Sequence, residues 1–167
     1  AMQFEHEGFA DAVMGALRES GLEAGKLELE LTESTAMRDP ERVINQIEPL
    51  RDLGVTFAID DFGTGHSSLS YLTRMPFDVF KIDQSFVRDM SRDKHAHIVV
   101  ETILAMARSL KLKTVAEGVE TTEQLSALRQ QGCTLAQGYL FGRPMPLDEL
   151  VEFAANADRE SEAALKA

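Results

Sequence analysis

The sequence predicts an α/β protein with a mostly parallel sheet, and three observations lead to that fold class. Helical and strand-like patterns alternate along the chain, and the order strand-then-helix repeats five times. The strand-like segments are short and largely apolar, and each one ends in polar or charged residues. Alternation of this kind joins parallel strands through right-handed crossovers. It fits a TIM-type barrel or an open doubly wound sheet, although five strands are too few to close an eight-stranded barrel.

Two helices and two strands are expected in the first part of the chain. Residues 9–19 carry apolar side chains at helical spacing, and Gly21 ends this helix. Residues 26–31 alternate between apolar and charged side chains, which indicates a strand. Residues 40–53 form a second helix that begins with a proline, whose fixed φ suits a first helical turn. Residues 55–59 form an apolar run that is typical of a buried strand.

The middle of the chain predicts a short helix, a strand and a long helix. Residues 68–74 form the short helix, which stops before Pro76 because the residue preceding a proline is disfavoured in helical geometry. Residues 77–82 form the next strand. Residues 93–110 form the long helix, which opens at an aspartate or a neighbouring residue.

Two further strand and helix pairs complete the predicted order. Residues 114–116 form a short strand, and residues 121–131 form a helix whose first threonine is suited to capping. Residues 133–137 form the last strand, and residues 147–165 a terminal helix. The acidic, alanine-rich tail at residues 158–167 is expected to fray.

Composition limits the classes of function. The 167 residues are expected to form one domain. A formal net charge of −11 argues against nonspecific binding to nucleic-acid polymers, but not against a small phosphorylated ligand that is held through metal ions. With Cys133 as the single cysteine, no disulfide can form within the chain, which fits a cytoplasmic protein. No membrane contact is expected, since no apolar run approaches the length of a membrane span.

Polar side chains follow all five predicted strands. They are Glu30 and Glu33 around the end of the first, Asp60 and Asp61 after the second, Lys81 and Asp83 at the third, Glu117 and Glu120 after the fourth, and Gln137 at the fifth. Because active sites of parallel α/β sheets and barrels form at the carboxyl ends of the strands, these residues are the candidate site.

The carboxylates among these residues predict a metal centre. Several carboxylates brought together would repel one another, and a hard divalent cation such as Mg²⁺ or Mn²⁺ removes that repulsion. The consecutive Asp60 and Asp61 could contact two metal ions, and paired metals suit cleavage of a phosphodiester. Lys81 could orient the attacking water or stabilise developing negative charge.

Each residue also has a simpler interpretation. Asp60 and Asp61 alone could cap a helix or form a turn, and Glu30 or Lys81 alone could be a solvated surface charge. The loop that begins at Gly63 is by itself weak evidence for phosphate binding. The joint pattern favours a functional site, because five successive strands rarely all end in polar residues by chance.

Five motifs in order resemble those of the EAL domain family. They are Glu30-Leu31-Thr32-Glu33, Asp60-Asp61-Phe62-Gly63-Thr64-Gly65-His66-Ser67-Ser68-Leu69, Lys81-Ile82-Asp83, Glu117-Gly118-Val119-Glu120, and Gln137-Gly138-Tyr139-Leu140-Phe141-Gly142-Arg143-Pro144. The resemblance extends from about Gln3 to Phe153. It implies a (β/α)₈ TIM-type barrel that hydrolyses cyclic di-GMP to linear pGpG with Mg²⁺ or Mn²⁺.

The resemblance also implies a role for each matching residue. The metal ligands would be Glu30, Asp60, Asp61 and Glu117. Lys81 would hold the catalytic water, and Glu120 would be a further supporting acid. The substrate pocket would be lined by Asp83, Gln137, Arg143 and Pro144. Glu33 would anchor the loop that follows the aspartate pair, with Ser67 as its partner. In the family, this loop is associated with metal binding and with regulation through dimers.

Two features of the family pattern are absent from the sequence. It has no Glu-Ala-Leu tripeptide, and its asparagines, Asn45 and Asn156, both lie in predicted helices rather than at a strand end. We therefore expect an incomplete barrel that lacks the first strands, with two metal ligands missing and impaired activity. An exposed sheet edge and interior would favour a homodimer or a domain-swapped oligomer. The alternatives are a noncatalytic module that binds cyclic di-GMP or a protein partner, and a structural domain with no nucleotide role.

Overall fold

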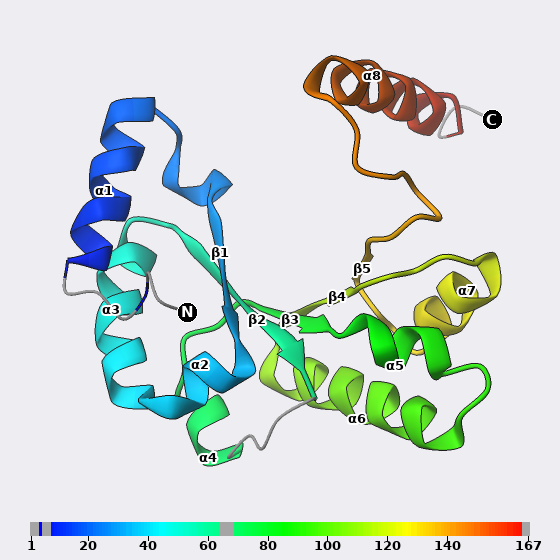
Figure 1. Ribbon diagram of the computed structural model, residues 1–167, viewed down its shortest axis with the longest axis horizontal. Helices are drawn as coiled ribbons and strands as arrows, with labels where there is room; N and C mark the ends of the chain where they lie inside the picture. Colours follow the sequence, from blue (N-terminus) through cyan, green and yellow to red (C-terminus); the bar gives the residue numbers. More distant parts are fainter. Residues whose placement is uncertain (1–3, 5–7, 64–68, 165–167) are drawn as a thin grey trace.

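A computed structural model describes residues 4, 8–63 and 69–164, with side chains up to residue 156 (Figure 1). Its centre is a five-stranded sheet in which every neighbouring pair is parallel. The strands are β1 (Glu28–Thr32), β2 (Thr56–Phe62), β3 (Val79–Ile82), β4 (Lys113–Ala116) and β5 (Leu135–Ala136). The α/β class with a parallel sheet is confirmed.

The strand order decides between the two architectures that the sequence left open. The order is β1-β2-β3-β4-β5, so each strand lies beside the strand that precedes it in the chain. A doubly wound sheet would reverse direction at a switch point, whereas a TIM-type barrel adds strands in sequence. The described residues therefore form part of a barrel, with β1 and β5 at the two edges of the sheet.

The helices alternate with the strands, as expected, and two short ones were missed. The α-helices are α1 (Phe9–Ser20), α2 (Glu33–Arg38), α3 (Pro40–Asp52), α4 (Leu69–Leu72), α5 (Gln84–Asp89), α6 (Lys94–Leu110), α7 (Thr122–Gln130) and α8 (Leu147–Ala164), and a 3₁₀ turn, η1, spans Ala24–Lys26. Helices α2 and α5 have six residues each, too few for helical periodicity to be visible in the sequence. Each is capped by the residue before it, Thr32 for α2 and Asp83 for α5.

Several strand boundaries differ from the predicted ones. The strand predicted at residues 55–59 runs to Phe62, so the two aspartates lie within β2 rather than after it. The strand predicted at 26–31 starts at Glu28, because a 3₁₀ turn occupies the residues before it. The strand predicted at 133–137 is regular only at Leu135–Ala136. Side-chain hydrogen bonds between Thr114 and Thr134 replace ladder pairing at the start of β5.

The hydrophobic core lies between the sheet and the helices that follow its strands. Phe57 of β2 and Phe80 of β3 are fully buried. Helix α3 contributes the buried Val43, Ile47 and Leu50, whose spacing places them on one helical face. Helix α2 contacts β1 and β2, and α6 contacts β3 and β4. This packing fixes the sheet and leaves the carboxyl ends of the strands free to form a site.

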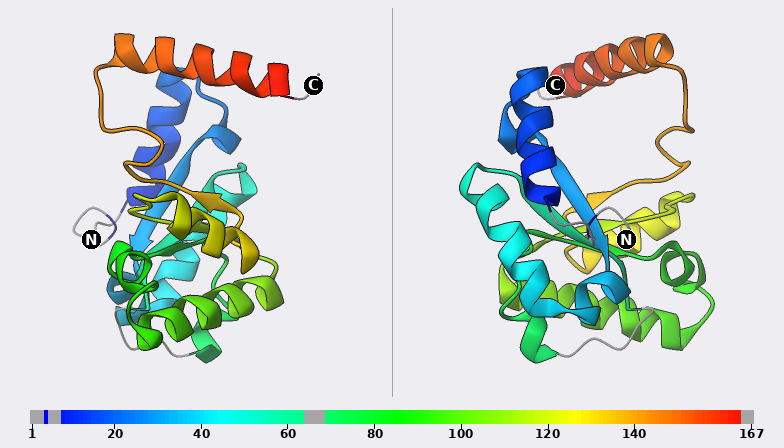
Figure 2. Two further views of the ribbon diagram at one scale, coloured as in Figure 1. Left: turned by 90° about the vertical axis from the view of Figure 1, so that its right-hand side faces the viewer. Right: turned by 60° about the vertical axis from the view of Figure 1, so that its left-hand side comes forward.

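Helix α8 is joined to the rest of the structure by an extended segment, as Figures 1 and 2 show. Its first two turns carry the exposed apolar side chains of Leu147, Leu150, Val151 and Phe153. In the part of the chain that the structure describes, no helix is both long enough and apolar enough to cross a membrane.

Candidate metal centre and adjoining pocket

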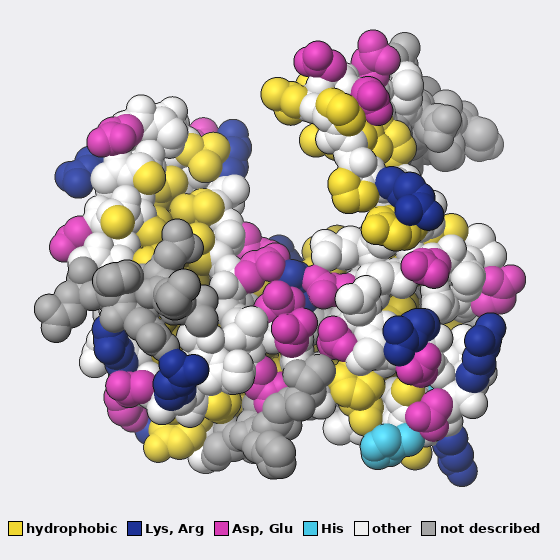
Figure 3. Space-filling view, in the orientation of Figure 1, with side chains coloured by type: hydrophobic (Ala, Val, Ile, Leu, Met, Phe, Trp, Pro, Cys, Tyr) yellow, Lys and Arg dark blue, Asp and Glu magenta, His cyan; other side chains and the backbone are white. Residues whose placement is uncertain are grey.

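The candidate site is an acidic cluster at the carboxyl ends of the strands. Glu30 lies on β1, Asp60 and Asp61 on β2, and Glu117 directly after β4. Carboxylate side chains gather at the centre of the face shown in Figure 3, around a small patch of positive charge. The structure therefore brings together all four residues that the sequence predicted as metal ligands.

Lys81 of β3 holds the cluster together. Its ammonium nitrogen, Nζ, lies 2.6 Å from Glu30 Oε2, 2.7 Å from Glu117 Oε1 and 3.1 Å from Asp60 Oδ1. The Lys81 side chain is only 7% exposed, so these ion pairs are shielded from bulk water. One lysine thus contacts carboxylates from the strands on both sides and from the strand beyond.

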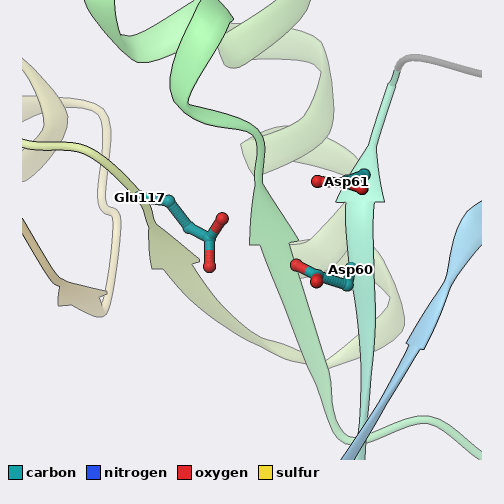
Figure 4. Close-up of side chains that lie close together, drawn as sticks. All are labelled: Asp60, Asp61 and Glu117. Carbon is teal, nitrogen blue, oxygen red and sulfur yellow. The ribbon is translucent and has the colours of Figure 1, made fainter.

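A bulge in β2 lets two consecutive aspartates serve one site. The pairing of β2 with β3 shifts register between Ile59 and Phe62, and Asp61 has a left-handed backbone with φ of 54°. Successive side chains of a regular strand point to opposite faces, and a bulge changes that alternation. Figure 4 shows Asp60 and Asp61 on β2, with Glu117 facing them from the end of β4.

The ligand atoms of these three residues are close enough to share a cation. One carboxylate oxygen from each of Asp60, Asp61 and Glu117 lies within 4.8 Å of the other two. Asp60 Oδ1 is buried, and Lys81 Nζ lies 3.1 Å from it. Carboxylate oxygens gathered in this way suit hard divalent cations.

The electrostatics of the cluster also favour an added cation. Burial raises the pKa of Glu117, and the charges of Asp60 and Glu30 add to this rise, whereas Lys81 acts in the opposite direction. Burial, followed by the charges of Asp60 and Asp83, raises the pKa of Asp61. Burial lowers the pKa of Lys81, but its bonds to Glu117, Glu30 and Asp60 more than offset this, so the lysine stays charged. One ammonium leaves the four carboxylates with an excess of negative charge, and a divalent cation would reduce that excess.

A pocket of about 420 Å³ adjoins the acidic cluster. Its lining includes five residues that the sequence placed in the site, namely Glu117, Glu120, Gln137, Arg143 and Pro144. Gln137 Nε2 donates a 2.9 Å hydrogen bond to Glu117 Oε1, which links the pocket to the cluster. The guanidinium of Arg143 lies 4.2 Å from the centre of the Tyr139 ring.

Two predicted site residues hold backbone in place. Glu33 is 2% exposed, and its Oε2 accepts a 2.9 Å hydrogen bond from the Gly63 backbone N–H at the end of β2. Its expected partner, Ser67, lies outside the described residues, so that pairing remains a prediction. Asp83 Oδ1 accepts hydrogen bonds from the backbone N–H and the hydroxyl of Ser85, and so caps α5.

Sequence reasoning missed other residues of the pocket. Gln84 and Tyr139 line it, but neither carries a charge or a recognisable spacing of its own. Gly138 is required by close packing, because a Cβ at this position would lie 2.3 Å from the backbone of Val119. In the sequence, Gly138 is visible only as a glycine at a strand end beside polar residues. Its contact with the Val119 backbone is set by the tertiary structure.

Comparisons with known proteins identify the family. The model of the EAL domain matches residues 1–144. The chain is 51% identical over 143 residues to the cyclic di-GMP phosphodiesterase NbdA of Pseudomonas aeruginosa, covering 86% of this chain and 18% of NbdA. A solved structure of the PaMucR phosphodiesterase in complex with c-di-GMP has a TM-score of 0.87 at 48% identity, covering 89% of this chain and 60% of that one.

A further solved structure is a manganese and cy-diGMP complex of BlrP1 from Klebsiella pneumoniae. It has a TM-score of 0.77 at 34% identity, and the match covers 85% of this chain and 36% of BlrP1. The chain spans 18% of the length of NbdA and 23% of the length of MucR, a second curated relative from Pseudomonas aeruginosa.

Proposed function

The chain belongs to the EAL domain family. From this membership we propose that it forms part of the catalytic domain of a phosphodiesterase that hydrolyses cyclic di-GMP to linear pGpG. The observation that carries the proposal is the position of Lys81. Its ammonium lies between Glu30, Asp60 and Glu117, beside a pocket of about 420 Å³. The curated relative NbdA is a cyclic di-GMP phosphodiesterase, which supports the same substrate for this chain.

Hydrolysis would use the residues of the cluster and of the pocket together. Water attacks one phosphorus, the bond to the 3′ oxygen breaks, and the ring opens to a 5′-phosphomonoester and a free 3′ hydroxyl. Lys81 orients the attacking water and stabilises negative charge that develops on the phosphate. Gln137 fixes the orientation of Glu117 through its 2.9 Å hydrogen bond, and Arg143 at the pocket wall attracts the second phosphate.

Asp60, Asp61 and Glu117 fit a divalent cation, Mg²⁺ or Mn²⁺, with Glu30 as a further ligand. When bound, such a cation lowers the pKa of a coordinated water and neutralises charge on the phosphate. Glu30 and Glu117 both pair with Lys81, and this shared contact supports their proposed role as ligands.

We further propose that these 167 residues alone hydrolyse the substrate poorly. They contain no Glu-Ala-Leu tripeptide, and the ligands available in the described part all come from β1, β2 and the end of β4. Catalytic groups must be held within about 0.5 Å of productive geometry, and a sheet with two open edges provides less support than a closed barrel.

The open edges also suggest self-association. Among the described residues, β1 and β5 each pair with a neighbouring strand on one side alone, and α8 carries exposed apolar residues. A second copy that covers these surfaces would appear as a dimer in sedimentation velocity measurements. A strictly monomeric species with cooperative unfolding would contradict this part of the proposal.

The test combines calorimetry and product analysis. Purified chain with Mn²⁺ should bind cyclic di-GMP, release pGpG slowly, and lose both properties in the Asp60→Asn variant. Binding without any release of pGpG would instead support a noncatalytic cyclic-di-GMP module. Absence of binding would refute the proposed function, and fast turnover would refute the proposed impairment alone.

A further inference from the structure

Gln124 connects two segments that carry site residues. It lies in the first turn of α7 and is 7% exposed. Its Oε1 accepts hydrogen bonds from the backbone N–H groups of Glu120, at 2.8 Å, and Thr121, at 3.0 Å. Its Nε2 donates a 3.4 Å hydrogen bond to the carbonyl oxygen of Val87 in α5. Both ends of one buried amide are therefore used.

The oxygen and the nitrogen of the Gln124 amide have different roles. Thr121 and Gln124 form a capping box, in which the third helical residue accepts from the N-cap N–H. A glutamate serves equally well in a capping box, since only an acceptor is required. The bond to Val87 requires a donor, which glutamine has and an ionised glutamate lacks. The amide therefore does something that capping alone does not explain.

Other contacts show that the segment from Glu117 to Thr121 is fitted closely to its neighbours. A Cβ at Gly118 would lie 2.6 Å from the Cβ of Gln84, the first residue of α5. Val119 donates to the carbonyl oxygen of Gln137, and its own carbonyl accepts from Leu140. The segment is therefore packed against α5 on one side and against the turn after β5 on the other.

Both neighbours carry site residues. Helix α5 begins two residues after β3, the strand of Lys81, and Asp83 caps it. Glu117 donates from its backbone N–H to the carbonyl oxygen of Ile82, so the two strand ends are already in register. A shift of the Glu117–Thr121 segment away from α5 would move the Glu117 carboxylate relative to Lys81, from which it is 2.7 Å distant.

We propose that Gln124 is a positioning residue for the metal centre. Its amide fastens the segment that carries Glu117 and Glu120 to α5, and so sets the distance between Glu117 and the aspartates of β2. This inference rests on the proposed function, because it concerns the same site. It adds a residue that lies outside the acidic cluster and does not line the pocket itself, although it holds the backbone of the pocket residue Glu120.

The experiment compares three variants of the full chain by Mn²⁺ titration, followed calorimetrically. Gln124→Glu keeps the capping acceptor and removes the donor to Val87, and Gln124→Ala removes both. Thr134→Val is the control, because it removes hydrogen bonds between β4 and β5 at the opposite ends of these strands. Melting temperatures identify the general loss of stability in each variant.

Both Gln124 variants should lower the affinity for Mn²⁺ about tenfold, as loss of outer hydrogen bonds around metal ligands does. Thr134→Val should lower the melting temperature without changing that affinity. Unchanged affinity in Gln124→Glu, or an equal loss in Thr134→Val, would overturn the inference.

Wild-type chain that binds no Mn²⁺ would contradict the proposed function instead. Amide hydrogen exchange of the metal-free chain then decides the positioning inference. Gln124→Glu should speed exchange at the Val119 N–H, which is bonded to Gln137, and leave the start of α7 protected. Unaltered exchange at Val119 would overturn it.

Discussion

Asp60 and Asp61 are consecutive residues of one strand, yet a carboxylate oxygen of each lies within 4.8 Å of the same oxygen of Glu117. The cause is the bulge between Ile59 and Phe62, where Asp61 adopts a φ of 54°. For a residue other than glycine this backbone costs about 1 kcal/mol or more. This strained backbone allows the carboxylates of both aspartates to reach one site.

Replacement of Asp61 by asparagine should separate metal binding from strain. Asparagine tolerates the left-handed backbone, so the fold should persist, and loss of the repulsion from Asp60 should leave stability equal or slightly higher. Affinity for Mn²⁺ should fall about tenfold or more in a calorimetric titration, because a charged ligand is lost. Asp11→Asn, on the exposed face of α1, is the matched control and should bind Mn²⁺ like the wild type.

Lys81→Met should destabilise the metal-free protein. The variant leaves Glu30, Asp60 and Glu117 without their shared ammonium, and we expect a loss of about 2 kcal/mol in the free energy of unfolding at neutral pH. Urea unfolding measures this loss. Added Mn²⁺ should recover part of it, since the cation supplies the missing positive charge. Lys113→Met, at an exposed position, is the control and should leave the free energy of unfolding unchanged. Full stability of Lys81→Met without metal would show that the ion pairs do not contribute to stability.

Gly138→Ala should be strongly destabilising. A Cβ would lie 2.3 Å from the Val119 backbone, and φ at this position is 155°. We expect a loss of about 2 kcal/mol or more, and separation of the turn after β5 from the Val119 segment. Gly15→Ala is the opposite case, because nothing lies within 4 Å of its Cβ position in α1. That change should stabilise by about 0.5–1 kcal/mol, and urea unfolding of both variants tests the pair.

Tyr139 should contribute to ligand binding through its ring and not through its hydroxyl. Its ring lies 4.2 Å from the Arg143 guanidinium at the pocket wall, a cation–π contact worth about 0.5–1 kcal/mol. Tyr139→Leu should weaken cyclic di-GMP binding about fivefold, and Tyr139→Phe should change it by less than about twofold. Tyr71 also contacts an arginine, Arg74, at 5.9 Å, but lies outside the pocket. Tyr71→Leu should therefore leave affinity unchanged, and an equal loss there would remove the special role of Tyr139.

Much of the candidate site follows from the sequence because it depends on strand ends. Glu30, Lys81 and Glu117 lie at or next to the carboxyl ends of predicted strands, and parallel strands bring such ends to one edge. The helix that begins with Pro40 and the cap at Thr121 follow from local chemistry, and the structure confirms both helices. These are properties of residues close together in the chain.

The tertiary structure alone decided the relationships between distant segments. Only the strand order distinguished a barrel from a doubly wound sheet, because both repeat the same strand and helix pattern. The bulge at Asp61 depends on pairing with β3, and the amide of Gln124 finds its acceptor in α5, 37 residues away. Local sequence sets which residues are polar and where elements begin. The distances that make those residues a site are set by packing, which no short stretch of sequence contains.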